Sequence, residues 1–218
     1  MKRRGLVISI IVLVVLIGGI LGFVLYRPDP VKLVQEGIDK LSKASSFRYT
    51  LTQQQWVEGQ ERKLTQINGE KSGARVRVWG TLVGTDVEMI RTENAFYTRD
   101  PFTKHWIRFP SSSPYQEVFL AELDPLSSLQ FKELGEVVLT GQEKVDGKRA
   151  WVVQLKPSVN NPIMELSWTD FTYTLYITRK DKEIVKAEIV ALSKDKREPV
   201  QMSLGFRDYG EQIQIEEP

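Results

Sequence analysis

Apolar and polar residues alternate along most of positions 47–208, and this pattern constrains the fold more than any other feature of the chain. A period of two is typical of a β-strand with one buried face. Tight-turn residues, such as Gly59 and the pair Asp146-Gly147, separate the alternating segments. Neighbouring strands joined by tight turns pair in antiparallel fashion. The sequence therefore predicts a mainly β (α+β) domain.

We expect about ten antiparallel strands in this region. An open twisted sheet of that width curls or closes, because each strand is rotated relative to its neighbour. The expected architecture is a strongly curved antiparallel half-barrel whose curved face is covered by a few helices. Its apolar interior is then either filled by side chains or partly hollow.

Helical patterns interrupt the alternation at two places. Apolar residues recur at three- and four-residue spacing over positions 31–41, which predicts an amphipathic helix to about Ala44. Asp29, followed by a proline, is the expected N-cap of this helix. The segment Tyr115–Leu134 predicts two short helices, the second capped by Asp124 before another proline. The segment Pro157–Asp170 is expected to be a loop.

The N-terminal segment Gly5–Tyr26 contains 22 residues and no charge. As a helix it would be about 33 Å long, enough to cross a bilayer core of about 30 Å. It is longer than the apolar core of a signal peptide, and no small-residue cleavage site follows it. We expect residues 1–27 to form a cytoplasmic tip and a retained transmembrane anchor, and residues 28–218 to form an extracytoplasmic domain.

The orientation of the anchor follows from its flanking charges. Three basic residues precede the apolar run, whereas Arg27 alone follows it closely. By the positive-inside rule this predicts a single-pass protein of the cell membrane with a cytoplasmic N-terminus. Gly18 and Gly22 form a G-x-x-x-G pair. The pair either supports close helix dimerisation or reflects the general abundance of glycine in membrane helices.

Composition excludes several classes of chemistry. The chain has no Cys and one His, which excludes disulfides, thiolate nucleophiles, iron–sulfur clusters and multi-His metal sites. Without Lys2, Arg3, Arg4 and Arg27, the chain has 26 basic and 28 acidic residues. No basic stripe interleaved with aromatic residues is present, which argues against nucleic-acid binding. We expect no cofactor and no metal.

Few residues suggest catalysis. His105 is a candidate general base, but no G-x-S-x-G motif accompanies it, and we interpret it as an ordinary strand histidine. Asp86 and Glu88 lie two residues apart on an expected strand and therefore share a face, as paired acid–base carboxylates would. Charges on an exposed face would show the same spacing. We expect the protein not to be an enzyme.

Aromatic and other large apolar residues are better candidates for function, because they can line an apolar pocket. The alternative is core and sheet-surface packing, which is the role of most such residues in proteins. The apolar segments 163–168 and 118–131 are the expected lid over such a pocket, since apolar residues in connecting segments need cover. The candidates for ligand contact are Phe47, Tyr49, Val78, Trp79, Met89, Phe96, Trp106, Trp151, Trp168 and Tyr173.

Several short segments, taken in their order along the chain, resemble the extracytoplasmic lipoprotein-carrier superfamily (LolA/LolB/LppX-LprG-like). These segments are Asn94–Trp106, which ends in Lys-His-Trp, Thr140–Val153 with its Asp-Gly hairpin, Leu175–Glu188, and Phe206–Gly210 before the C-terminus. The resemblance covers the chain from about Pro30 onward. It implies a curved half-barrel, covered by helices on its concave side, with a cavity for acyl chains or another apolar ligand. The expected protein anchor departs from the soluble or lipid-tethered carriers of that superfamily.

Two functions remain open at this point. The first is a membrane-anchored extracytoplasmic protein that binds a lipid or lipoprotein-like apolar ligand without catalysis. The second is a structural or signalling ectodomain with a solidly packed interior that binds a protein partner at the cell surface.

Overall fold

The computed structural model describes residues 27–110, 123–195 and 197–218. The expected anchor over Gly5–Tyr26, and most of the segment expected to form the first mid-chain helix, lie outside these residues. In the described part of the chain, no helix is both long and apolar enough to cross a membrane. The anchor therefore stays a prediction from the sequence.

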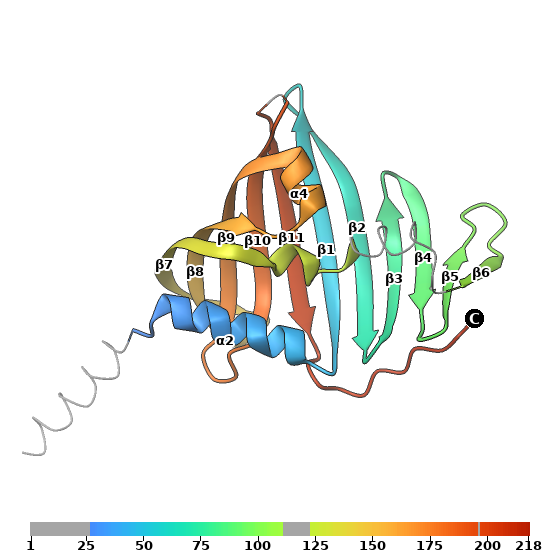
Figure 1. The fold of residues 1–218 in the computed structure, drawn as a ribbon, viewed down its shortest axis with the longest axis horizontal. Coiled ribbons are helices and arrows are strands. Elements are labelled where there is room, and N and C mark those ends of the chain that lie inside the picture. The colour runs from blue at the N-terminus through green and yellow to red at the C-terminus, as the bar shows by residue number, and fades with distance from the viewer. Residues whose placement is uncertain (1–26, 111–122, 196) are drawn as a thin grey trace, which may run out of the picture.

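Eleven strands form a single antiparallel sheet with the order β6-β5-β4-β3-β2-β1-β11-β10-β9-β8-β7. The sheet is strongly curved, and α2 and α4 lie on its concave side (Figure 1). This confirms a mainly β, half-barrel-like fold with few helices, with one strand more than the sequence suggested. The elements are α2 Pro30–Lys43, β1 Ser46–Val57, β2 Gln60–Ser72, β3 Arg75–Leu82, β4 Thr85–Arg91, β5 Ala95–Arg99, β6 Trp106–Pro110, η1 Ser127–Leu129, β7 Phe131–Val145, β8 Lys148–Val159, α4 Pro162–Ser167, β9 Trp168–Thr178, β10 Ile184–Ser193 and β11 Pro199–Arg207.

Helix α2 begins where the sequence predicts. The Asp29 carboxylate accepts hydrogen bonds from the backbone N–H groups of Val31 at 2.9 Å and Lys32 at 3.2 Å. These bonds satisfy donors that the first helical turn leaves unpaired. The apolar stripe of the helix, which includes the buried Leu33 and Leu41, packs over β7, β9 and β10.

The main hydrophobic core lies on the concave side of the sheet, which we call the inner face. It contains side chains from α2 and from strands on both sides of β1. Smaller apolar clusters lie on the opposite, outer face. In one of them Ile213 and Ile215 of the C-terminal segment pack against Ile90 and Tyr97, so that this segment covers part of the outer face of β4 and β5.

The expectation of a loop over Pro157–Asp170 is wrong. Strand β8 continues to Val159, the short helix α4 follows, and β9 begins at Trp168. The cause is a second Asx-Pro cap, because Asn161 Oδ1 accepts hydrogen bonds from the N–H groups of Ile163 at 3.0 Å and Met164 at 3.1 Å. The same cap chemistry that starts α2 thus starts α4.

The second mid-chain helix is also shorter than expected. Asp124 caps only a turn, in which its Oδ1 accepts a hydrogen bond from the Leu126 N–H at 2.9 Å. A single 3₁₀ turn over Ser127–Leu129 follows, and β7 already begins at Phe131. The alternation of β7 therefore starts within the segment that the sequence assigned to helix.

Gly69, on the inner face, leaves no space for a larger side chain. The ring of Tyr49, on the neighbouring strand, covers Gly69, and a Cβ atom there would lie 2.0 Å from Tyr49 Cζ. A Gly69→Ala substitution should lower the free energy of unfolding by about 1–3 kcal/mol, because the buried ring must move. Urea denaturation measures this loss.

Gly141→Ala is the matched control. Gly141 also lies in a strand, β7, and a Cβ atom there would meet nothing within 4 Å. This variant should be neutral or slightly stabilised, because alanine loses less backbone entropy on folding than glycine. Equal destabilisation of both variants would contradict the assigned packing of Tyr49 over Gly69.

Candidate functional site

The inner face of β1–β6 is built from rows of directly paired residues. Residues that lie opposite each other on antiparallel strands share a face and are in side-chain contact. One row runs from Tyr49 through Gly69 and Val78 to Met89. Tyr49, Val78 and Met89 are all buried. The alternation read from the sequence thus produces a continuous apolar surface across β1–β4.

Most of the predicted ligand contacts share this face. Trp168 is half-buried and packs against the main core. The others are buried within the core itself and come from strands on both sides of β1, namely Phe47, Tyr49, Val78, Met89, Phe96, Trp151 and Tyr173. The structure therefore gathers these eight side chains around one interior, and whether they contact a ligand stays a prediction.

Trp79 and Trp106 lie on the outer face and cannot line the same interior. Trp79 pairs with Glu88, and the Arg77 guanidinium lies 5.1 Å from the centre of its ring. Trp106 packs against the outer cluster that includes Tyr97. The prediction that Trp79 and Trp106 line the same pocket as the other candidates therefore does not hold. For Trp79 the reason is that it is adjacent to Val78, and adjacent residues of a strand point to opposite faces.

Two buried tyrosines tie the sheet to residues 123–129. The Tyr49 hydroxyl donates a hydrogen bond to the Leu123 carbonyl at 3.2 Å, and the Tyr173 hydroxyl donates one to the Ser128 carbonyl at 2.9 Å. Burial raises the pKa of both phenols above the ordinary tyrosine value. Both hydroxyls remain protonated at neutral pH and act as structural donors.

A charged cluster at the inner face was missed by the sequence reasoning. Asp124 is half-buried, and burial raises the pKa of its carboxyl, while the nearby charges of Arg91 and Lys71 oppose the rise. Lys71 and Arg91 occupy positions that alternate in phase with apolar residues such as Met89. The sequence could have indicated this cluster, because both cations fall on the apolar side of their strands.

Two pockets lie beside the helices. One of about 610 Å³ lies beside α4 and β9 and is lined in part by Trp168, Phe171 and Lys194. Another of about 410 Å³ lies between α2 and the start of β7, with Ile38 and Phe131 among its lining residues. Both mix apolar and charged walls, as the rim of an amphiphile-binding cleft would.

The candidate catalytic groups form ordinary surface contacts. Glu88 accepts hydrogen bonds from Arg77 at 2.7 Å and Arg99 at 3.0 Å, and Asp86 pairs with Lys104 at 3.4 Å. His105 is exposed in the connection between β5 and β6. Among residues 27–110, 123–195 and 197–218, no group of three or more His, Asp or Glu could hold a metal ion.

No protein-family model matches the chain, and no curated protein matches it in sequence. Its structure is similar to the crystal structure of the Mycobacterium tuberculosis lipoprotein LppX, with a TM-score of 0.60 and 13% identity, covering 87% of this chain and 100% of that one. It is also similar to LprF from Mycobacterium bovis, with a TM-score of 0.59 and 14% identity, covering 88% of this chain and 99% of that one. The chain therefore shares the fold of these proteins, as the resemblance in sequence implied.

The pKa of Asp124 predicts how this residue affects stability. A carboxyl whose pKa is raised by folding costs stability at pH values above its unfolded pKa, because the fold disfavours its charged form. Asp124→Asn keeps an oxygen that can accept the Leu126 hydrogen bond and removes the buried charge. The variant should have a higher free energy of unfolding than the wild type at pH 7.

Urea titrations at two pH values check this prediction. The difference should vanish below the ordinary Asp pKa of 3.8, where the carboxyl is protonated in both states. A variant less stable than the wild type at pH 7 would show that attraction to Lys71 and Arg91 outweighs burial.

Proposed function

We propose that the protein binds the acyl part of a lipid, or a similarly apolar ligand, on the inner face of its sheet and performs no catalysis. The observation that carries this proposal is the continuous apolar row that runs across the inner face from β1 to β4. The contacts of α2 with the sheet are with β7, β9 and β10, and α4 contacts β9. These helices therefore pack over the other half of the sheet.

The shared fold with the mycobacterial lipoprotein LppX supports a role at a membrane surface. Apolar burial supplies the affinity in this proposal, at about 0.8 kcal/mol for each methylene removed from water. The half-buried Val76, Val87 and Phe109 lie at the margin of the inner core, where a chain would enter.

The location is part of the proposal. Residues 1–27 would hold the domain beside the outer surface of the cell membrane, and α2 begins only three residues after Arg27, at Pro30. So short a connection would keep the domain next to the lipid. Fixed in this way, the protein would receive, present or sense its ligand locally.

Native mass spectrometry of the full chain released from detergent micelles tests ligand binding. We expect bound lipid on the wild type and about tenfold weaker binding for Phe109→Gln, since burial of a phenylalanine side chain commonly supplies that much or more. Trp79→Gln is the matched control, because Trp79 is another half-buried aromatic residue on the same half of the sheet, on the outer face. It should bind lipid as the wild type does.

Equal loss in both variants would contradict the assignment of the inner face. A wild-type chain that takes up no lipid would contradict the proposed function. That result would instead favour the structural or signalling ectodomain with a filled interior.

Limited proteolysis tests the location. Protease added to spheroplasts that express the chain should degrade residues 28–218, while a cytoplasmic marker protein stays intact. Protection of the domain until the membrane is lysed would contradict the proposed orientation.

A further inference from the structure

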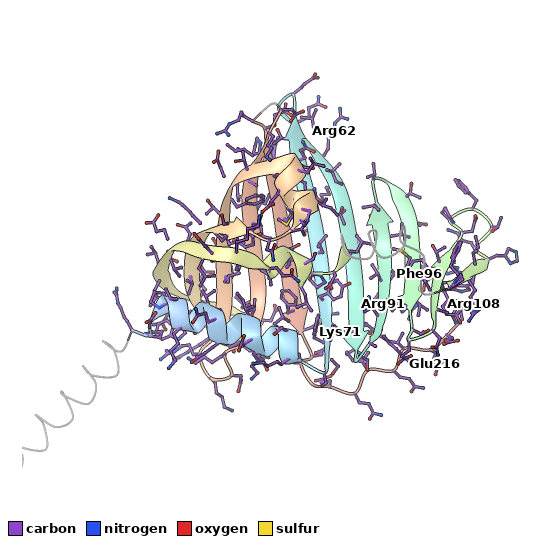
Figure 2. All side chains as sticks on the ribbon, in the orientation of Figure 1. Arg62, Lys71, Arg91, Phe96, Arg108 and Glu216 are labelled. Atoms are coloured by element: carbon purple, nitrogen blue, oxygen red, sulfur yellow. The ribbon has the colours of Figure 1, made fainter. Side chains whose placement is uncertain are left out.

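Two cations interrupt an otherwise apolar row on the inner face. Figure 2 shows Lys71, Arg91 and Phe96 toward the same end of neighbouring strands, and Arg62 at the opposite end of β2. Residues paired directly across antiparallel strands lie side by side on one face. The complete row, from β1 to β6, is Phe47, Lys71, Val76, Arg91, Phe96 and Phe109.

The two cations differ sharply from their neighbours in exposure. Arg91 is exposed, whereas Phe96, directly opposite on β5, is only 5% exposed. Lys71 is half-buried, its Nζ lies 5.6 Å from the centre of the Phe47 ring, and it donates a hydrogen bond to the Ala44 carbonyl at 3.3 Å. Both side chains therefore combine an apolar base with a charged end that water or a ligand can reach.

Among residues 27–110, 123–195 and 197–218, the charge of this cluster is not balanced. Asp124 is the carboxylate that interacts with both Lys71 and Arg91, and its raised pKa shows that burial outweighs this attraction. The acidic residues of the adjacent outer face have their own partners, since Glu70 pairs with Arg48 at 2.7 Å and Glu93 pairs with Arg75 at 3.3 Å. Within the described part of the chain, two cations against one carboxylate leave a net charge of about +1 beside apolar surface, which a single anionic group would neutralise.

The spacing suits one small head group. Lys71 and Arg91 are separated by one strand, β3, so their backbones are about 10 Å apart. Side chains of this length can converge on an anion between them, with Val76 beneath it. A guanidinium can donate two parallel hydrogen bonds to a carboxylate or phosphate, and an ammonium adds a compact charge.

We propose that Lys71 and Arg91 bind the anionic head group, a carboxylate or a phosphodiester, of an acyl lipid whose chain lies along the inner face toward Val78 and Met89. This inference rests on the proposed lipid-binding function and specifies its ligand class as singly anionic amphiphiles. The apolar rows bind the chain, and the two cations select the head.

The test compares lipids that differ only in the head. The full chain in a neutral detergent is titrated with phosphatidylglycerol or phosphatidylcholine of identical acyl chains, and binding is followed by native mass spectrometry. Phosphatidylglycerol should bind at least about tenfold more tightly, the factor typical of a hydrogen bond to a charged group. Glycerol phosphate, which carries the head alone, should not displace the lipid.

Charge-neutralising variants show which residues cause the preference for phosphatidylglycerol over phosphatidylcholine. Lys71→Gln and Arg91→Gln should each lower the ratio of the two affinities several-fold, and the double variant should bring it close to one. Arg62→Gln is the matched control, because Arg62 is an exposed cation at the other end of the same strand, and its ratio should stay unchanged. Asp124→Asn should raise the ratio, because it removes the carboxylate that competes with the ligand.

The outcomes separate this inference from the function on which it rests. Equal binding of both lipids by the wild type, or an unchanged ratio in the double variant, would overturn the head-group assignment and leave lipid binding in place. Displacement of the lipid by glycerol phosphate would overturn the claim that the site is for a lipid and assign it to a free phosphate compound. Absence of both lipids from the wild type would contradict the proposed function, and this inference with it.

Discussion

The pairing of β1 with β11 is the interaction on which the rest of the structure depends. It runs over eight residue pairs, from Arg48 opposite Arg207 to Gln55 opposite Val200. It joins the strands β1–β6 to the strands β7–β11, so that segments far apart in the chain become one sheet. On the outer face Arg48 bridges Glu70 at 2.7 Å and Asp208 at 3.0 Å, which ties β2, β1 and the end of β11 together. Without this pairing the inner face would be two unconnected surfaces.

The C-terminal segment extends the same connection across the outer face. Ser46 Oγ donates a hydrogen bond to the Glu211 carbonyl at 2.6 Å, and the Tyr97 hydroxyl donates one to Glu217 at 2.7 Å. Between these two contacts, Ile213 and Ile215 are buried. The segment therefore covers apolar outer residues of β4 and β5. The inner face, which also holds the main hydrophobic core, is the face proposed to bind the ligand.

The inner face combines two properties that rarely coincide unless they are used together. Its rows are apolar over several strands, and one of them carries Lys71 and Arg91 beside a half-buried Asp124. Lys71 is half-buried, and a core that served only stability would gain nothing from a cation there, because desolvating a charge costs free energy. The shared fold with LppX and LprF fixes the architecture in which this surface lies, but at such low identity it says nothing about the head group.

The sequence by itself determined the strand pattern, the curvature that a wide sheet requires and the start of α2, because these depend on local alternation and on a cap within one turn. The sequence also contains two signals that the prediction did not use. One is the Asn161-Pro162 cap of α4, and the other is that Trp79 directly follows Val78 and therefore cannot share a face with it. Only the tertiary structure decided that β1 pairs with β11, that Trp106 packs on the outer face and that Asp124 meets Lys71 and Arg91. The physical reason is that caps and alternation involve residues a few positions apart, whereas register between distant strands is set by the packing of the whole sheet.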